Sequence, residues 1–296
     1  LARDWKGQIA AVLADTPPAL LNRALSYLYA KETRSSFLIE REEPGRAREE
    51  RFIAVLRDAG KVPIEQALTL ERLVALQNTL VDPRYAEKTY RQIQNYVGAT
   101  LPGVREQIHY ITVPPALVLS LMSGLAATAN RLESVSPVVQ AAVTGFLFVF
   151  IHPFEDGNGR IGRMLITLML WKLGVLHQPN FFVSGYFEAH KDEYIERMRA
   201  VSATGDWTGW VVFFLQAMHA QATVNIQTAD AIFRLHGEMR ERFREVLNSQ
   251  FHDQALDFVF ASPVFRNDRF VERSGIPPSS ARALSRRLVE AGLLRT

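Results

Sequence analysis

Twelve consecutive residues constrain this chain more than any other feature: His152 to Arg163 read HPFEDGNGRIGR. An apolar run over residues 138–151 precedes them, and apolar residues with helical spacing over 160–173 follow them. The apolar run includes Gln140 and is too short to cross a bilayer, so it predicts a buried helix. The twelve residues are therefore expected to form a glycine-containing turn between two helices.

This turn has the features of an anion site. Gly157 and Gly159 lack Cβ atoms, so their backbone can take a positive φ and approach a ligand closely. The segment opens into a helix, whose first amide groups are unpaired and lie at the positive end of the helix dipole. Arg160 and Arg163 are three residues apart and project from one face, where guanidinium groups suit phosphate oxygens. Together these residues predict a site for a nucleotide triphosphate.

Three further side chains suit chemistry on such a ligand. Asp156 is the predicted Mg²⁺ ligand, with Glu155 as the alternative, because Mg²⁺ beside phosphates takes one or two protein oxygens. His152 is the predicted general base, since an unperturbed imidazole has a pKa of about 6.5. Each feature alone also has a structural explanation, such as a capping histidine, an ordinary turn or an arginine ion-pair network. Their combination in twelve residues favours a functional site.

The same residues carry a family resemblance. The pattern His-Pro-Phe-x-Asp-Gly-Asn-Gly-Arg-x-x-Arg over 152–163 resembles the signature of Fic-domain proteins, and every specified position is present. Residues 94–98 resemble the segment before the family's hairpin flap, and 108–115 resemble the flap and the helix entry after it. Aromatic residues resemble those of the family's later helices: Tyr186, Phe187, Tyr194, Trp207 and Trp210. The resemblance covers residues 30–220, and it implies a Fic-type helical bundle.

The resemblance implies transfer of AMP from ATP to a Ser, Thr or Tyr hydroxyl of a target protein or of the chain itself. His152 would take the hydroxyl proton, and Asp156 would hold Mg²⁺ between the α- and β-phosphates. Arg160 would bind the β-phosphate and Arg163 the γ-phosphate, while the Asn158 side chain would meet the α-phosphate. The other ATP-binding residues that it implies are Gly157 and Gly159, through their amides, and Tyr186.

A second motif, upstream of the first, has a regulatory meaning. The family's inhibitory helix carries Ser or Thr, three residues, Glu, and then Gly or Asn; Ser36 and Glu40 match, whereas Arg41 departs. By resemblance, Glu40 would pair with Arg163 and remove it from the γ-phosphate, since carboxylate and phosphate compete for the same fork. The same Glu40 is a candidate for positioning a water in the reverse reaction. The alternative is an ordinary Ser–Glu pair on an amphipathic helix.

The whole chain is expected to be mostly α-helical, with one small β-hairpin. Helices are predicted over 46–59, 63–80, 115–132, 137–151, 160–173, 188–203 and 207–248, and strand alternation over 99–115. An exposed hairpin edge there is a candidate for pairing with an extended target segment, and a simple surface hairpin is the alternative. The predicted domains are an N-terminal helical region (1–60), a catalytic domain (61–250) and a C-terminal module (251–296).

The C-terminal module resembles a winged helix-turn-helix. A short helix over 267–274, a turn over 275–278 and a longer helix over 279–291 would precede a wing strand. Seven arginines and three acidic residues over 263–296 give a net charge of +4, against +3 for the whole chain. Three arginines are predicted on the face of the longer helix that would meet the major groove: Arg282, Arg286 and Arg287. Docking of a protein is the alternative role.

Composition and the N-terminal residues bound the setting. The chain has no cysteine, which excludes disulfides, cysteine-ligated zinc and a thiol nucleophile. No signal-peptide pattern and no apolar segment long enough to span a membrane are evident, so a cytoplasmic protein is expected. ATP and a hydroxyl-bearing target protein are the expected partners; a homodimer and DNA are left open.

Two other functional hypotheses compete with AMP transfer. One is a DNA-binding regulator whose Fic domain senses a nucleotide without catalysis. The intact pair of His152 and Asp156 disfavours it, because a sensor needs a phosphate cradle but no base. The other is a Fic transferase that uses a different phosphate-containing donor. The intact Arg163 favours a triphosphate donor.

Overall fold

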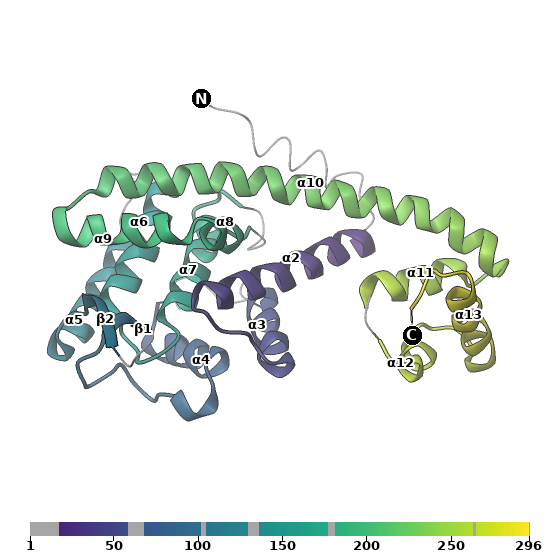
Figure 1. The fold of residues 1–296 in the computed structure, drawn as a ribbon, viewed down its shortest axis with the longest axis horizontal. Coiled ribbons are helices and arrows are strands. Elements are labelled where there is room, and N and C mark those ends of the chain that lie inside the picture. The colour runs from purple at the N-terminus through teal and green to yellow at the C-terminus, as the bar shows by residue number, and fades with distance from the viewer. Residues whose placement is uncertain are drawn as a thin grey trace. The chain divides into compact units, whose positions relative to one another are not determined.

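The computed structural model describes residues 18–58, 68–101, 105–129, 136–176, 181–262 and 265–295. Within these ranges the chain is mostly α-helical with one two-stranded antiparallel sheet, which confirms the predicted fold class (Figure 1). The elements in chain order are α2 (Pro18–Ile39), α3 (Arg46–Asp58), α4 (Leu70–Leu80), a 3-10 turn (Pro83–Tyr85), β1 (Tyr96–Leu101), β2 (Arg105–Ile111), α5 (Pro115–Ala129), α6 (Pro137–Ile151), α7 (Asn158–Lys172), α8 (Ser184–Ala189), α9 (Lys191–Thr204), α10 (Trp207–Leu247), α11 (His252–Ala261), α12 (Asn267–Arg273) and α13 (Pro278–Glu290).

The chain forms two compact units. Among the described residues, the larger unit lies within Leu28–Thr223, and the smaller unit includes residues 18–27 together with those after 223. The predicted domain boundaries, after residues 60 and 250, stay a prediction, and residue 60 lies outside the described ranges. No helix within those ranges combines the length and apolar character that crossing a membrane requires.

Helices α6 and α7 form the centre of the larger unit. They pack against each other, and α7 is buried continuously from Ile161 to Leu170 because other helices cover it on several sides. Trp210 of α10 is buried beside this pair, and its indole N–H donates to the Ala142 carbonyl of α6 at 3.1 Å. Aromatic rings surround that indole: Phe146, Phe187, Tyr194, Phe213 and Phe214. The apolar residues of α6 therefore pack this helix firmly in the core, and this fixes the position of the turn that follows it.

The strand predicted over 99–115 covers only part of the observed hairpin, which consists of β1 and β2. β1 begins at Tyr96, inside the segment expected to precede the flap, and pairs antiparallel with β2. Val97 pairs with Tyr110 but Gly98 pairs with Ile108, so His109 is an extra residue in β2. Such a bulge breaks the simple alternation that the sequence predicts and re-aims a side chain. Residues 102–104 of the predicted strand lie outside the described ranges.

Several predicted helix boundaries need correction. The helix expected over 188–203 is two helices, α8 and α9, because His190 leaves helical geometry with φ −119° and ψ 38°. Helix α4 begins at Leu70, and the hydroxyl of Thr69 before it accepts from the Arg72 N–H. The predicted helical residues 63–67, before α4, and 130–132, after α5, lie outside the described ranges. Helix α11 was not predicted at all.

The smaller unit has its own core. The end of α10 packs with α11, α12 and α13 around a cluster that includes Phe243, Leu256, Phe270, Leu284 and Leu288. Helices α12 and α13 form the expected helix-turn-helix, in which Gly275 takes a φ of +73°. No strand follows α13 in the described residues, so the wing stays a prediction.

Candidate functional site

The predicted turn lies between α6 and α7. Helix α6 ends at Ile151, and His152 follows it in the left-handed region with φ 55° and ψ 60°. Gly157 has a φ of +89° and is the N-cap of α7, which begins at Asn158. Few residues other than glycine favour a positive φ. This preference explains the glycine at position 157. The left-handed backbone of His152 is unfavourable by itself, so surrounding contacts must maintain it.

The His152 ring has one defined tautomer. Its Nδ1 lies 3.1 Å from the Val149 carbonyl oxygen, which can only accept a hydrogen bond. Nδ1 therefore carries the proton, and Nε2 is left as the basic nitrogen. Burial lowers the pKa of His152 below its ordinary value, although the Val149 carbonyl and the Glu40 carboxylate oppose the shift. A neutral imidazole at pH 7 is the form that can accept a proton.

The Asn158 side chain is used inside the turn. Its amide oxygen accepts from the Phe154 N–H at 3.0 Å, and its amide nitrogen donates to the Phe154 carbonyl at 2.8 Å. The side chain is buried, so it braces the loop and does not point into open space. The amide oxygen and one N–H of the amide are therefore occupied. In this conformation the residue could offer an α-phosphate only its second side-chain N–H and its main-chain amide.

Asp156 and Arg160 form a pair at the start of α7. Asp156 Oδ1 accepts from the Gly157 N–H and from Arg160 Nη2, each at 2.6 Å, which leaves Oδ2 outside both bonds. Within the described residues, no group of three or more histidines and carboxylates could hold a metal. A lone, partly exposed carboxylate instead suits Mg²⁺ that keeps its waters and arrives with phosphates. Asp156 therefore fits the predicted metal.

The second arginine of the signature is held by the end of α2 and by Glu40, the residue that follows this helix. Arg163 Nη1 donates to Glu40 Oε1 at 2.9 Å, Nε to Ser36 Oγ at 3.1 Å, and Nη2 to the Ser36 carbonyl at 2.7 Å. Burial opposes ionisation of Glu40, but attraction to the Arg163 guanidinium outweighs it and holds the Glu40 pKa below its ordinary value. A Cβ at position 159 would collide with Glu40 Oε1. Gly159 is therefore what allows this carboxylate to reach the start of α7.

The residue that departs from the inhibitory pattern sits in a left-handed turn. Arg41 has a φ of 59°, the Glu42 N–H donates to the Phe37 carbonyl, and the Arg41 N–H donates to the Leu38 carbonyl. These are the two hydrogen bonds of a Schellman motif, in which glycine or asparagine is favoured at the left-handed position. The turn that Gly or Asn would form is thus retained with Arg41 in their place.

The Schellman turn brings a second carboxylate to the site. Glu42 Oε2 accepts from Arg160 Nη1 and from Arg48 Nη2, each at 2.9 Å. Both guanidinium groups also lie over the Phe37 ring, with centroid distances of 4.8 Å for Arg160 and 5.0 Å for Arg48. Both arginines predicted to bind phosphate are therefore engaged by carboxylates of one short segment after α2. The sequence motif identified Glu40 but offered no signal for Glu42.

A buried carboxylate on α2 anchors this helix to the rest of the unit. Glu32 accepts from the main-chain N–H and from the hydroxyl of Ser184, at the start of α8. Burial raises the pKa of Glu32. Glu32, Ser36 and Glu40 follow one another at intervals of four residues, so one face of α2 and the turn that continues it make all three contacts.

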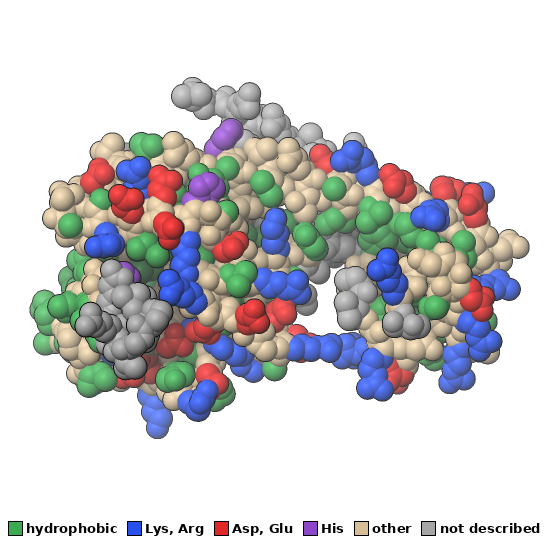
Figure 2. Space-filling model, viewed as in Figure 1, with side chains coloured by type: hydrophobic (Ala, Val, Ile, Leu, Met, Phe, Trp, Pro, Cys, Tyr) green, Lys and Arg blue, Asp and Glu red, His purple; other side chains and the backbone are tan. Residues whose placement is uncertain are grey.

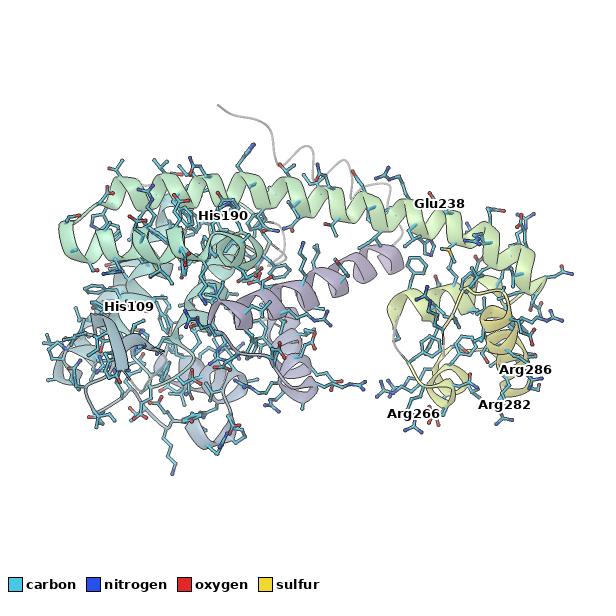
Figure 3. The ribbon with its side chains drawn as sticks, viewed as in Figure 1. His109, His190, Glu238, Arg266, Arg282 and Arg286 are labelled. Atoms are coloured by element: carbon cyan, nitrogen blue, oxygen red, sulfur yellow. The ribbon has the colours of Figure 1, made fainter. Side chains whose placement is uncertain are left out.

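A cavity of about 510 Å³ lies beside the turn. From the predicted set, His152, Gly159, Arg163 and Glu40 line it, whereas Ser36, Asp156, Gly157, Asn158, Arg160 and Tyr186 do not. Tyr186 instead stacks on His190, whose label in Figure 3 marks the place, at a centroid distance of 4.0 Å. The opposite walls come from the hairpin and α9: Val97, Gly98, His109, Tyr110, Lys191 and Tyr194. The bulge at His109 explains how that side chain, labelled in Figure 3, reaches the cavity.

Comparison with known proteins agrees with this geometry. Residues 67–170 match the Fic/DOC family. A Fido domain-containing protein of Dictyostelium discoideum is 37% identical over 92 residues, which are 30% of this chain and 60% of that protein. A protein named protein adenylyltransferase Fic of Culex quinquefasciatus is 29% identical over 151 residues, or 49% of this chain and 27% of that protein. The chain thus spans less than two thirds of each of these relatives.

Solved structures share the fold. A Fic family protein of Desulfovibrio desulfuricans aligns over 93% of this chain and 90% of its own, with a TM-score of 0.52 and 18% identity. Fic-1 of Caenorhabditis elegans aligns over 77% of this chain and 72% of its own, with a TM-score of 0.56 and 19% identity. Residues 67–170, which hold the signature between α6 and α7, therefore form a segment that matches the Fic/DOC family.

Proposed function

We propose that this chain is a protein adenylyltransferase, which transfers AMP from ATP to a Ser, Thr or Tyr hydroxyl of a target protein or of itself. The observation that supports this most directly is that His152, whose Nδ1 faces the Val149 carbonyl so that Nε2 is the basic nitrogen, lines the same cavity as Gly159 and Arg163. The name of the Culex relative, protein adenylyltransferase Fic, agrees with AMP transfer.

In the proposed reaction, the hydroxyl oxygen of the target attacks the α-phosphorus of ATP and its proton passes to His152 Nε2. A bond forms between that oxygen and the α-phosphorus, the bond from the α-phosphorus to the bridging oxygen breaks, and pyrophosphate leaves. The amides of Asn158 and Gly159 and the guanidinium groups of Arg160 and Arg163 would hold the phosphates, whereas the Gly157 N–H, also predicted to do so, donates to Asp156 in this conformation. Catalysis would come from positioning and charge stabilisation, as in phosphoryl transfer generally.

Magnesium is the expected companion of ATP, and Asp156 would hold it through the oxygen that Arg160 and Gly157 do not use. When bound, Mg²⁺ would neutralise charge on the phosphates. The remaining work belongs to residues of the chain, which orient the nucleotide and accept the proton.

The conformation described here is proposed to be the restrained one. Glu40 holds Arg163, and a γ-phosphate would have to displace that carboxylate before Arg163 could bind it. Ser36 supports the restraint by taking two further donors of Arg163. Release of the segment after α2 would free the guanidinium groups for ATP.

The decisive experiment measures label on protein from α-labelled ATP with Mg²⁺. Four proteins are compared: the wild type, Glu40→Gly, Glu40→Gly with His152→Ala, and Glu43→Gly as a control. Glu43 is exposed and neighbours the same segment, so its replacement tests for a nonspecific effect. We expect strong labelling only with Glu40→Gly, and its loss with His152→Ala. Labelling that survives without His152 would refute the base assignment. If no protein is labelled although ATP binds, a nucleotide sensor or another donor becomes the better reading.

We propose a second activity for the smaller unit, which is binding of duplex DNA. The exposed face of α12 and α13 is rich in arginine (Figure 2), and Arg266, Arg282 and Arg286 point away from the core of the unit in Figure 3. Arg287, predicted on the same face, instead donates to the Leu247 carbonyl at 2.9 Å and helps to hold α13 in place. The expected groove-facing set is therefore reduced to Arg282 and Arg286.

Titration of labelled duplex DNA at several salt concentrations tests this activity. Each phosphate contact contributes about one unit to the log–log slope, so Arg282→Ala with Arg286→Ala should lower the slope by about two. Arg242→Ala on α10, also exposed, is the matched control and should leave the slope unchanged. Affinity that does not depend on salt would exclude the activity. A homodimer stays a prediction, and the oligomeric state can be measured in the same preparations.

A further inference from the structure

Arg91 is a buried cation whose hydrogen bonds all go to main-chain carbonyls. Its side chain is only 2% exposed, and among the described residues it makes no ion pair. Nε donates to the His152 carbonyl at 2.7 Å, and Nη1 donates to the Ile93 carbonyl at 2.9 Å. Nη2 donates to the carbonyls of Val113 and, at 3.5 Å, Ile151. A buried arginine without a carboxylate partner is unusual, because burying an unpaired charge costs free energy. The hydrogen bonds to these carbonyls must therefore compensate for that cost.

Those carbonyls belong to two different parts of the larger unit. Ile93 lies just before β1 and Val113 just after β2, so they mark the two ends of the hairpin. Ile151 and His152 form the end of α6, where the proposed base is located. One guanidinium therefore joins both stems of the hairpin to the residue that carries the imidazole.

The main chain of Arg91 strengthens the same connection. Its N–H donates to the Pro153 carbonyl at 2.9 Å, so Arg91 forms hydrogen bonds to the peptide groups on both sides of Pro153. Two neighbouring links run in parallel: the Tyr110 hydroxyl donates to the Phe150 carbonyl, and the Asn95 amide donates to the Phe154 carbonyl. These hold the hairpin to the loop, but only Arg91 contacts His152 itself.

The contact bears on the conformation of His152. A residue other than glycine in the left-handed region needs surrounding interactions to keep it there. A charged donor fixed on the His152 carbonyl sets the direction of that peptide group, and with it the direction of the side chain. Because the other donors of Arg91 hold the hairpin stems, the imidazole and the hairpin keep one relative position.

We propose that Arg91 is a positioning residue for the transfer reaction. It maintains the left-handed backbone of His152 and aligns the imidazole with the hairpin, along which a target segment would lie. This inference rests on the proposed function, although the effect of Arg91 on the His152 ring can be measured without any activity.

The kinetic test uses the Glu40→Gly protein, in which self-labelling from α-labelled ATP is expected to be measurable. Arg91→Gln should lower the rate at saturating ATP about 30-fold or more, while the ATP concentration for half-maximal rate changes less than about 3-fold. Arg91→Lys, which keeps the charge and one strong donor, should recover part of the rate. Arg84→Gln is the control, because Arg84 is exposed and pairs with Asp82 nearby in the chain. An unchanged rate at saturating ATP, or a fall that only matches the loss of folded protein, would overturn the proposal.

A spectroscopic readout separates this proposal from the proposed function. In ¹⁵N spectra of ring-labelled histidine, the His152 signal, assigned with His152→Ala, should report an Nδ1-protonated ring in the parent protein. Arg91→Gln should shift this signal toward a mixture of tautomers, and Arg91→Lys should shift it less. If Arg91→Gln does not fold, the Arg91→Lys spectrum decides the matter. An unperturbed His152 signal in the folded variant would overturn the role of Arg91 even if the parent shows no transfer.

Discussion

Replacing Glu42 with Gln should release one of the two arginines that the segment after α2 engages. Arg160 is 1% exposed and Glu42 is 34% exposed, with 2.9 Å between Arg160 Nη1 and Glu42 Oε2. A charge-assisted hydrogen bond is worth about 1.5–3 kcal/mol, but Gln can still accept a weaker bond and water screens a partly exposed carboxylate. We therefore expect the change to weaken the restraint by about 1 kcal/mol, which is about 5-fold in apparent ATP affinity.

Glu40 should matter more than Glu42. Its partner Arg163 is equally buried, and Ser36 accepts from the other two guanidinium nitrogens, so each of the three nitrogens already has a partner. Replacing Glu40 with Gln should tighten ATP binding by about 2 kcal/mol, or about 30-fold. Because one Schellman turn joins the two carboxylates, loss of one should loosen the other. The double variant is therefore expected to gain less than the product of the single effects.

Calorimetric titration with ATP and Mg²⁺ measures these affinities. The His152→Ala background prevents turnover during the titration, and Glu43→Gln removes a neighbouring exposed carboxylate as the matched control. The reasoning about Glu42 would be refuted if Glu42→Gln and Glu43→Gln bound ATP with the same affinity in folded proteins. A full product of the two single effects would show that the carboxylates act independently.

Three further predictions follow from local geometry. Arg41→Gly should relieve the left-handed strain at φ 59°, stabilise the restrained conformation by about 1 kcal/mol and lower self-labelling about 5-fold; faster labelling would contradict this. Burial raises the pKa of Glu87 to about 7 from 4.5, so the stability that its protonated form contributes is complete below pH 4.5 and is lost as the pH rises through 7. The free energy of unfolding of Glu87→Gln, whose amide can still accept from the Glu155 N–H, should therefore fall less between pH 5 and 8 than that of the wild type. The difference should be about 1 kcal/mol because the group is partly exposed, and parallel curves of melting temperature against pH would contradict it. Asn158→Ala should leave the buried Phe154 N–H without its acceptor and cost about 2 kcal/mol, seen as a melting temperature about 4–8 °C lower; an unchanged melting temperature would show that water replaces the amide.

The order of elements around the signature was predictable because it depends on local preferences. Apolar spacing predicted α6 to the residue, and the glycines predicted a turn that opens into a helix. The spacing of Arg160 and Arg163 is a property of any helix, so their common origin on α7 followed from the sequence alone. Identification of the Fic signature rested on the same short segment, which is why the comparisons confirm it.

Local preferences were less informative where a single residue interrupts a pattern. His190 divides one predicted helix into α8 and α9, and the extra residue His109 disturbs the alternation of β2. Neither residue type is a strong breaker of its element. The interruption comes from the tertiary surroundings, where the Tyr186 ring stacks on His190 and the cavity receives His109.

Sequence alone predicted which groups would hold phosphate and accept a proton, because their chemistry and spacing lie within twelve residues. Only the tertiary structure decided what each group now contacts. Glu40 and Arg163 are separated by 123 residues, and the pairing of Glu42 with Arg160 spans 118. Arg91 reaches His152 across 61 residues. Such contacts depend on how distant helices and the hairpin pack, since a side chain takes the partner that packing brings within hydrogen-bond distance.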